Sequence, residues 1–276
     1  MIKKGVKATR VLISKSNKQI AKSKRSQITI FIIIAILLVV AIILFFLLAR
    51  KKPTDILKPS MPNPQEYIEK CVKDNTKNAI DIMLSQGGYI SPTNYKLYDD
   101  KKVAYLCYTN KFYYPCINQQ PMYIEFLEEE IKSYIEPKIK DCFFTLKKEY
   151  QDRNYNVNEG TLNLEVELNP KQVGININKR FEVSKNEETR RFDKFKVKFV
   201  SPLYDLAVVA QEIASQEAKF CYFEYLGFSL LYPVISIDKK QVGSEETASK
   251  IYIIKDKISG RQLLIAIRSC AMPGGL

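Results

Sequence analysis

Six cysteines are the residues of this chain best suited to covalent chemistry. No two of them form a C-x-x-C pair, so their spacing supports neither a zinc knuckle nor a thioredoxin-like redox motif. An even number, all beyond residue 70, is typical of up to three disulfides formed in an oxidising compartment. Free thiols in a reducing compartment are the alternative. The six are Cys71, Cys107, Cys116, Cys142, Cys221 and Cys270.

The disulfide pairing is not fixed by the sequence, because six cysteines allow fifteen connectivities. The elements expected around them favour one arrangement, in which each bridge joins neighbours in the fold. It pairs Cys71 with Cys142 between two helices, Cys107 with Cys116 across a short hairpin, and Cys221 with Cys270 between a third helix and the last strand.

Acid–base and metal chemistry have little support, because the chain contains no histidine. Ser-His-Asp and Cys-His catalysis and imidazole zinc sites are therefore excluded. The adjacent acids Glu128, Glu129 and Glu130 diverge by about 100° each on a helix, which favours a solvated face over a metal site. Asp205 and Glu224 are the candidates for a carboxylate hydrolase, which needs two carboxyl groups about 5–9.5 Å apart. We predict no catalytic residue, metal or cofactor, and thus no enzyme.

Tyrosines gather in one stretch and could bind a glycan or a peptide, since their rings offer flat amphipathic surface. Half-buried strand positions are the other interpretation, because tyrosine favours strands. The seven candidates are Tyr89, Tyr95, Tyr98, Tyr105, Tyr108, Tyr113 and Tyr114.

Three helices are expected to position these residues. The first begins at Asn63-Pro64, with Asn63 as N-cap and Glu66 closing a capping box, and ends at Gly87-Gly88. We expect that glycine pair to be a C-cap rather than a phosphate loop, because it closes a helix. The second covers 122–150 with a kink at Pro137, and the third runs from Ser201-Pro202 to Gly227.

Strands are indicated where apolar and polar residues alternate. A strand is expected at 103–108, and from residue 155 onwards the period of two returns repeatedly. The further strands are predicted at 161–168, 173–178, 195–201, 231–237, 250–256 and 262–268.

The net charge of +13 belongs mainly to the amino-terminal end. Residues 1–26 hold nine of the 43 basic residues and no acid, which leaves 34 basic against 30 acidic residues in the rest of the chain. Nucleic-acid binding by the main domain is therefore not expected.

An uncharged run from Ile28 to Ala49 follows that basic end. At about 1.5 Å per residue its 22 residues span about 33 Å, enough to cross a bilayer and too long for a cleaved secretory signal. Since the basic residues are concentrated before it, the positive-inside rule predicts a cytoplasmic amino terminus and an extracytoplasmic main domain.

The segment RSQITIF at 25–31 resembles the class III, type IV prepilin-like signal of archaea. That resemblance implies cleavage between Ser26 and Gln27, with the apolar helix kept on the mature protein. Phe31 stands where pilins usually carry Glu, which favours an anchor over a filament subunit. The stretch SQGGYI at 85–90 and the preceding Cys71 also resemble uncharacterised single-pass archaeal proteins, which implies no activity.

The predicted fold is therefore α+β: a single amino-terminal transmembrane helix, then an extracytoplasmic domain of antiparallel sheet packed with about three helices. The predicted divisions are a basic cytoplasmic tail (1–26), a transmembrane helix (27–49), a proline-rich spacer (50–62) and the domain 63–276, with sub-units 63–150 and 151–276.

The expected function is a non-enzymatic, membrane-anchored binding or surface-assembly protein. The alternative is a pilin-like subunit assembled through its hydrophobic helix, and a third is the carboxylate hydrolase. The expected partners are the lipid bilayer and other surface or pilus-like subunits, with the ligand unknown.

Overall fold

A computed structural model describes residues 24–49, 61–111, 113–244 and 247–270. The chain divides into two compact units, Met1–Ser60 and Met61–Leu276, which we call unit 1 and unit 2. Most of the predicted basic tail and nearly all of the predicted spacer lie outside the described residues.

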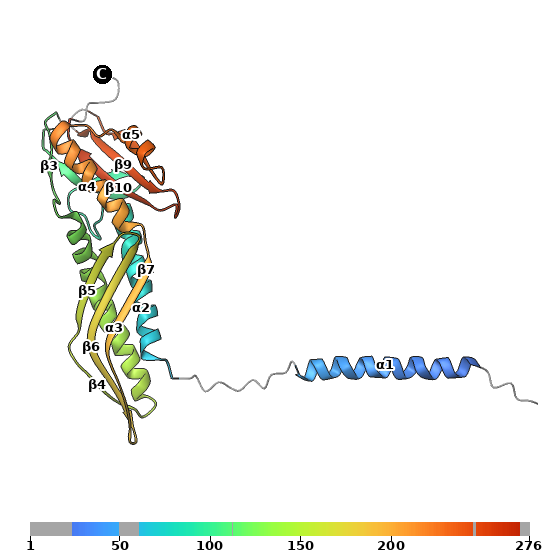
Figure 1. Cartoon of the computed structure of the whole chain (residues 1–276). Coiled ribbons are helices and arrows are strands. Elements are labelled where there is room, and N and C mark those ends of the chain that lie inside the picture. Colours follow the sequence, from blue (N-terminus) through green and yellow to red (C-terminus); the bar gives the residue numbers. More distant parts are fainter. Residues whose placement is uncertain (1–23, 50–60, 112, 245–246, 271–276) are drawn as a thin grey trace, which may run out of the picture. The chain divides into compact units, whose positions relative to one another are not determined.

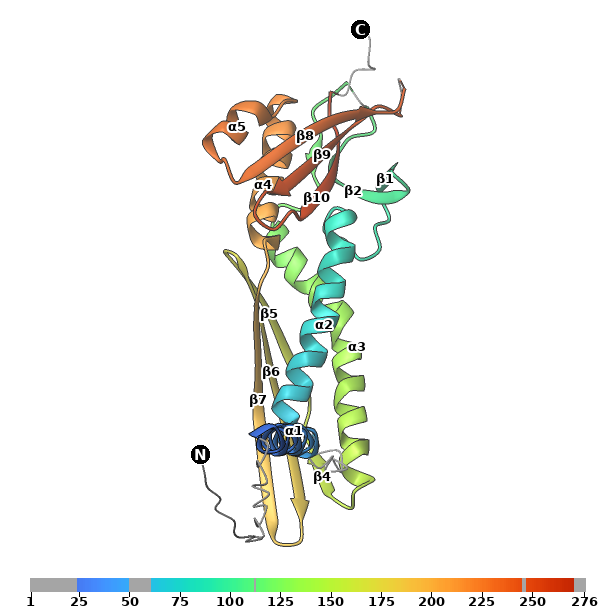
Figure 2. The same ribbon diagram turned by 90° about the vertical axis from the view of Figure 1, so that its right-hand side faces the viewer.

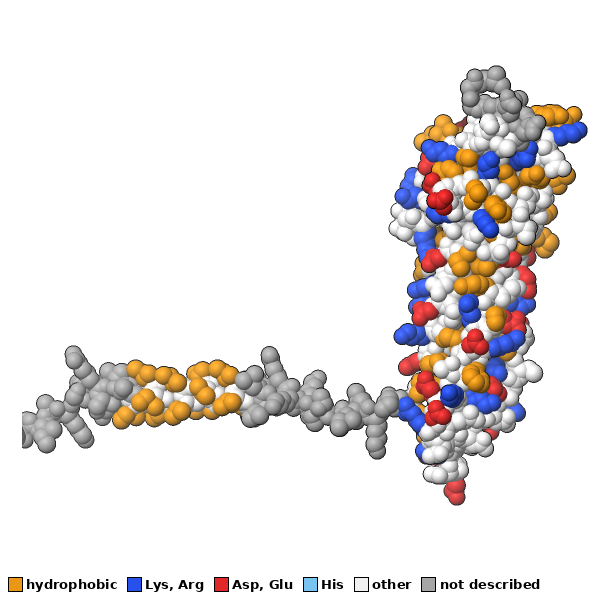
Figure 3. All heavy atoms as spheres, turned by 180° about the vertical axis from the view of Figure 1, so that it is seen from behind, with side chains coloured by type: hydrophobic (Ala, Val, Ile, Leu, Met, Phe, Trp, Pro, Cys, Tyr) orange, Lys and Arg blue, Asp and Glu red, His pale blue; other side chains and the backbone are white. Residues whose placement is uncertain are grey.

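Unit 1 contains the helix α1 (Lys24–Ala49), whose described side chains, at 30–45, are apolar and exposed (Figure 3). The prediction of a transmembrane helix is nevertheless wrong, because no helix among the described residues is long and apolar enough to cross a membrane. The predicted single-pass topology, with its cytoplasmic amino terminus and extracytoplasmic domain, depended on that helix and is not supported either.

Unit 2 begins with two long helices that pack on each other, α2 (Pro64–Ser85) and α3 (Tyr123–Gln151) (Figure 1). The Asn63 side chain caps α2 by accepting the Gln65 N–H at 3.0 Å. This confirms Asn63 as N-cap. The apolar positions of both helices, spaced three and four residues apart, are buried where the helices meet the rest of unit 2.

A four-stranded antiparallel sheet covers one side of these helices (Figure 2). Its central strand β6 (Gln172–Lys185) pairs with β7 (Glu188–Val200) along one edge. Along the other edge it pairs with β5 (Asn163–Asn169) and then β4 (Asn156–Glu159). Alternate residues of β5, β6 and β7 point into the helical layer and are buried, as the period of two predicts.

The second sheet of unit 2 has six strands in the order β1-β2-β10-β9-β8, with β3 also pairing with β2. Its pairs are antiparallel except β2 with β10, so the prediction of a purely antiparallel fold is corrected. The parallel pair joins two strands that are far apart in sequence. Hydrophobic periodicity predicts single strands and not which strands pair, so it gave no indication of this contact. The strands are β1 (Tyr95–Tyr98), β2 (Lys101–Tyr108), β3 (Ile117–Asn118), β8 (Ile235–Val242), β9 (Ser249–Asp256) and β10 (Gln262–Arg268).

The predicted third helix is two helices. The helix α4 (Leu203–Phe220) ends at Cys221, whose φ of 59° is left-handed, and α5 (Tyr225–Leu231) begins four residues later. Gly227, the predicted end, lies inside α5. A non-glycine residue seldom adopts this conformation, so the sequence gives no stop signal at Cys221.

All six cysteines form disulfides, which confirms the prediction of disulfide bonding. The pairs are Cys71–Cys142 between α2 and α3, Cys107–Cys116 beside the β2–β3 hairpin, and Cys221–Cys270 between the end of α4 and the residue two positions after β10. Each bridge joins elements that pack together, which is the arrangement the sequence favoured.

Candidate functional site

A buried ion pair organises the end of α4. Glu217 is fully buried, and its carboxylate lies 2.6 Å from the Lys250 ammonium on β9. The Tyr252 hydroxyl donates to the other carboxylate oxygen of Glu217. Burial lowers the pKa of Lys250 and raises the pKa of Tyr252. Both oxygens of Glu217 therefore have partners.

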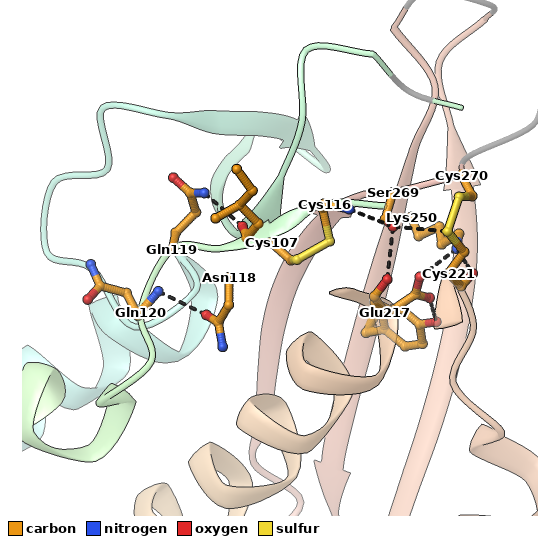
Figure 4. The surroundings of a disulfide bond; sticks show 12 residues. Cys107, Cys116, Asn118, Gln119, Gln120, Glu217, Cys221, Lys250, Ser269 and Cys270 are labelled. Carbon is orange, nitrogen blue, oxygen red and sulfur yellow. Dashed lines mark hydrogen bonds and ion pairs between the residues drawn. A yellow bond between two sulfur atoms is a disulfide. The ribbon is translucent and has the colours of Figure 1, made fainter. Parts of the chain in front are cut away.

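The same cluster is tied to the disulfides around it (Figure 4). Lys250 also donates to the Cys221 carbonyl at 2.7 Å, and the Ser269 hydroxyl donates to the Glu217 carbonyl at 3.0 Å. Ser269 in turn accepts the Cys116 N–H at 3.1 Å. Burying a charge pair costs desolvation, and here the ion pair and the surrounding hydrogen bonds offset that cost. Because each of these groups has a partner, the cluster holds the end of α4 in one position. We call this cluster of Glu217, Lys250, Tyr252 and Ser269 the joint.

Directly after this joint, apolar side chains point outwards. None of the residues of α5 is buried, and Leu230 and Leu231 are 84% and 78% exposed. Phe223, just before α5, is 1% exposed and packs on Tyr252 and Phe228, so it anchors the segment. We call the exposed apolar group the α5 surface: Phe220, Tyr222, Leu226, Leu230, Leu231, Tyr232, Val234 and Ile258.

Lysines surround the α5 surface. The Lys239 ammonium lies 5.1 Å from the ring centroid of Tyr222 and 5.0 Å from that of Tyr225. Lys219 lies over the Phe220 ring, and Lys257 donates to the Pro233 carbonyl.

Glu224, the N-cap residue of α5, is occupied locally. It accepts the Tyr222 hydroxyl at 2.5 Å and the Gly227 N–H at 3.1 Å, and the Tyr222 hydrogen bond is the main cause of its lowered pKa. The α5 surface therefore combines apolar side chains with a positive rim.

The seven predicted tyrosines do not share one surface. Tyr105 is buried and exchanges a hydrogen bond with Ser249, and Tyr108 packs beside it. Tyr113 and Tyr114 are exposed and contact each other.

Of the other three predicted tyrosines, Tyr98 packs against the same cluster as Tyr105 and Tyr108. Tyr89 packs on Phe126 of α3 and accepts a hydrogen bond from Gln120. Tyr95 and Tyr98 are half-buried on β1.

The carboxylates singled out in the sequence have separate structural partners. Asp205 accepts the Lys171 N–H in the first turn of α4, whereas Glu224 follows the last turn of that helix, which is about 27 Å long. They do not form the carboxylate pair of a hydrolase.

The three adjacent acids also diverge. Glu128 accepts the Leu168 N–H at 2.7 Å and Glu130 accepts the Ile90 N–H at 2.8 Å, while Glu129 pairs with Lys132. Only Glu129 matches the expected solvated face. Two of these acids instead satisfy backbone groups of other segments, which the sequence did not indicate.

The described ranges contain cavities but no cluster of metal ligands. No group of three or more His, Cys, Asp or Glu residues there could hold a metal ion. A cavity of about 430 Å³ lies beside Phe143, where Glu159 is held by Lys147 at 3.0 Å and Lys179 at 3.1 Å. A second, of about 320 Å³, lies between α3 and β5.

Comparison of the chain with protein-family models, curated proteins and solved structures finds no match in any of the three.

Proposed function

We propose that this chain is a non-enzymatic binding or assembly protein, and that the α5 surface holds an apolar segment of a partner protein bordered by acidic side chains. The observation that carries the proposal is the exposure of Leu226, Leu230 and Leu231 on a helix that buries no residue of its own. Contiguous exposed apolar surface with a polar rim is typical of protein interaction sites.

The partner's chemistry follows from the residues at the surface. Removing a leucine side chain fully from water contributes about 1.5–3 kcal/mol, so three leucines can supply much of a micromolar affinity. The lysine rim, with Lys219, Lys239 and Lys257, favours acidic residues on either side of the apolar contact. The buried Glu217–Lys250 pair holds the start of the segment in place, so little ordering is required on binding.

A designed peptide tests this proposal directly. The probe is an amphipathic helical peptide with a leucine face bordered by glutamates, and its partner control carries lysines instead. We expect the full chain to bind the acidic peptide at least about tenfold more tightly than the basic one in fluorescence anisotropy. Leu230→Asp with Leu231→Asp should abolish this binding.

A matched control substitutes an apolar residue elsewhere. Val200, at the end of β7, is 86% exposed, so Val200→Asp should leave peptide binding unchanged. Equal binding of both peptides, or an equal loss in the Val200 variant, would refute the proposed surface.

A pilin-like subunit is a second candidate, supported by one observation. Helix α1 runs without interruption from Lys24, so the bond between Ser26 and Gln27 lies in its first turn, ahead of the exposed apolar side chains at 30–45. Intact-mass measurement of the native protein tests it. Loss of residues 1–26 supports processing, and a full-length chain argues against it.

A further inference from the structure

The outer face of the four-stranded sheet carries charge in rows. Strand β7 contributes Lys194, Lys196 and Lys198, all exposed, and β5 contributes the exposed Glu165 and Glu167. Uncharged residues of β6 separate the two rows. We call this surface the striped face.

The pairing register makes the rows regular. Asn176 on β6 is paired with Lys196 on one side and with Glu165 on the other. Gly174 is paired in the same way with Lys198 and Glu167. Lys196 and Lys198 are thus each two strand spacings, about 10 Å, from a glutamate in their own copy, whereas Lys194 is aligned with Asn178 of β6 and Asn163 of β5. At physiological salt this distance exceeds the screening length of about 8 Å.

The charged side chains of the two rows make few interactions within the chain. Among the described residues Lys194, Lys196 and Lys198 form no ion pair, and Glu167 accepts a hydrogen bond only from Asn176. The helices α2 and α3 cover the opposite face of the sheet, so they leave the striped face open. No ion pair among the described residues therefore neutralises either row.

We propose that a second copy of this chain stacks on the striped face, with the two-fold axis parallel to the strands. That rotation places β7 of one copy over β5 of its partner, so that each lysine row meets a glutamate row, and it does so twice by symmetry. A two-fold axis across the strands would place lysines over lysines and glutamates over glutamates. The charge pattern therefore selects one of the two arrangements.

The dimensions of the sheet fit such a contact. The 14 residues of β6 extend about 46 Å, and three strands are about 14 Å wide. Stacking would bury about 640 Å² per copy and about 1,300 Å² in total, within the range of specific interfaces. Facing sheets lie about 10 Å apart, a spacing that extended lysine and glutamate side chains can bridge.

Charge reversal in the full chain tests the pairing. One variant changes Lys194, Lys196 and Lys198 to Glu, and the other changes Glu165 and Glu167 to Lys. We expect the wild type to be a dimer in sedimentation velocity at about 0.05 M salt and to dissociate towards about 1 M salt. Each variant alone should raise the dimer Kd at least about tenfold, and a mixture of the two should form a heterodimer.

Control variants distinguish the loss of this interface from misfolding and from changes at the α5 surface. Reversal of three exposed lysines on the helical layer, Lys70, Lys77 and Lys148, should leave the dimer unchanged. Leu230→Asp with Leu231→Asp should also leave it unchanged, so the two proposals fail independently. Circular dichroism should show all variants folded.

Three results would overturn the inference. They are a wild type that stays monomeric at low salt, equal dissociation in the Lys70/Lys77/Lys148 control, and particles that grow beyond a dimer with concentration.

Discussion

The two halves of unit 2 distribute charge in opposite ways. In the half formed by α2, α3 and the four-stranded sheet, apolar residues fill the interior and lysines and glutamates lie outside. At the α4–α5 end of the six-stranded sheet, Glu217 and Lys250 are inside and leucines are outside. The first pattern is that of an ordinary water-soluble surface. In the second pattern the buried charges hold the end of α4 in place, and the apolar side chains are exposed and can bind a partner.

The buried pair should give the largest effect of any single substitution. Glu217→Leu leaves the Lys250 ammonium buried without its carboxylate, so we expect a loss of about 3–5 kcal/mol in the free energy of unfolding, measured in urea. Glu217→Leu combined with Lys250→Met should recover most of it, because no unpaired charge remains. A loss below about 1 kcal/mol in the single variant would show that this ion pair does not hold the joint.

The loss of stability on removing a disulfide can be compared between the two halves, because it depends on the length of the loop that each disulfide closes. Removing Cys71–Cys142, whose cysteines are 71 residues apart, should cost about 4 kcal/mol, whereas Cys107–Cys116, with a separation of 9, should cost about 2.5 kcal/mol. Paired cysteine-to-serine variants in denaturant unfolding measure both. The reverse order would mean that packing around each bridge, rather than loop closure, decides its contribution.

Gly88, where the end of α2 meets α3, should be the next most sensitive position. Its φ is +84°, and an added Cβ would overlap the Tyr123 hydroxyl and Leu127, so Gly88→Ala should cost about 2–4 kcal/mol. The fully buried Tyr123 hydroxyl has no hydrogen-bond partner among the described atoms, and burial raises its pKa.

Tyr123→Phe supplies the matched test for Gly88. Because no hydrogen bond is lost, this variant should be as stable as the wild type or up to about 1 kcal/mol more stable in thermal unfolding. It should also recover part of the Gly88→Ala loss. If Tyr123→Phe is strongly destabilising, the hydroxyl has a partner and the Gly88 argument fails.

The smallest loss in the free energy of unfolding is expected at Glu159, which forms ion pairs nearer the surface than Glu217 does. Burial raises its pKa, but the hydrogen bonds from Lys147 and Lys179 outweigh burial and set the pKa below its ordinary 4.5. This stabilisation is present above pH 4.5 and is lost as the pH falls through the folded-state pKa. Glu159→Gln should therefore cost about 0.5 kcal/mol at pH 7 and nothing in acid. A pH-independent loss would contradict the assigned ion pairs.

Local signals in the sequence predicted much of unit 2. Asn63-Pro64 marks the start of α2 and Gly87-Gly88 marks its end, because caps depend on residues within one turn. The alternation in 161–168 and 173–178 placed β5 and the first half of β6 on one buried face. The three disulfides followed from expecting each cysteine to bridge packed neighbours.

Unit 1 shows where a local pattern misled. The run from Ile28 to Ala49 is long and apolar in sequence, yet no helix in the described part of the chain is able to span a membrane.

The sequence by itself determined the ends of α2, the strand periodicity and a favoured set of cysteine partners, because each depends on neighbours along the chain or on one packing contact. Only the tertiary structure decided that Glu217 and Lys250 meet, 33 residues apart, and that Cys221 breaks a helix so that leucines face outwards. It alone also aligned the lysine and glutamate rows on β7 and β5. These features arise from register and long-range pairing, for which the linear order of residues carries no signal.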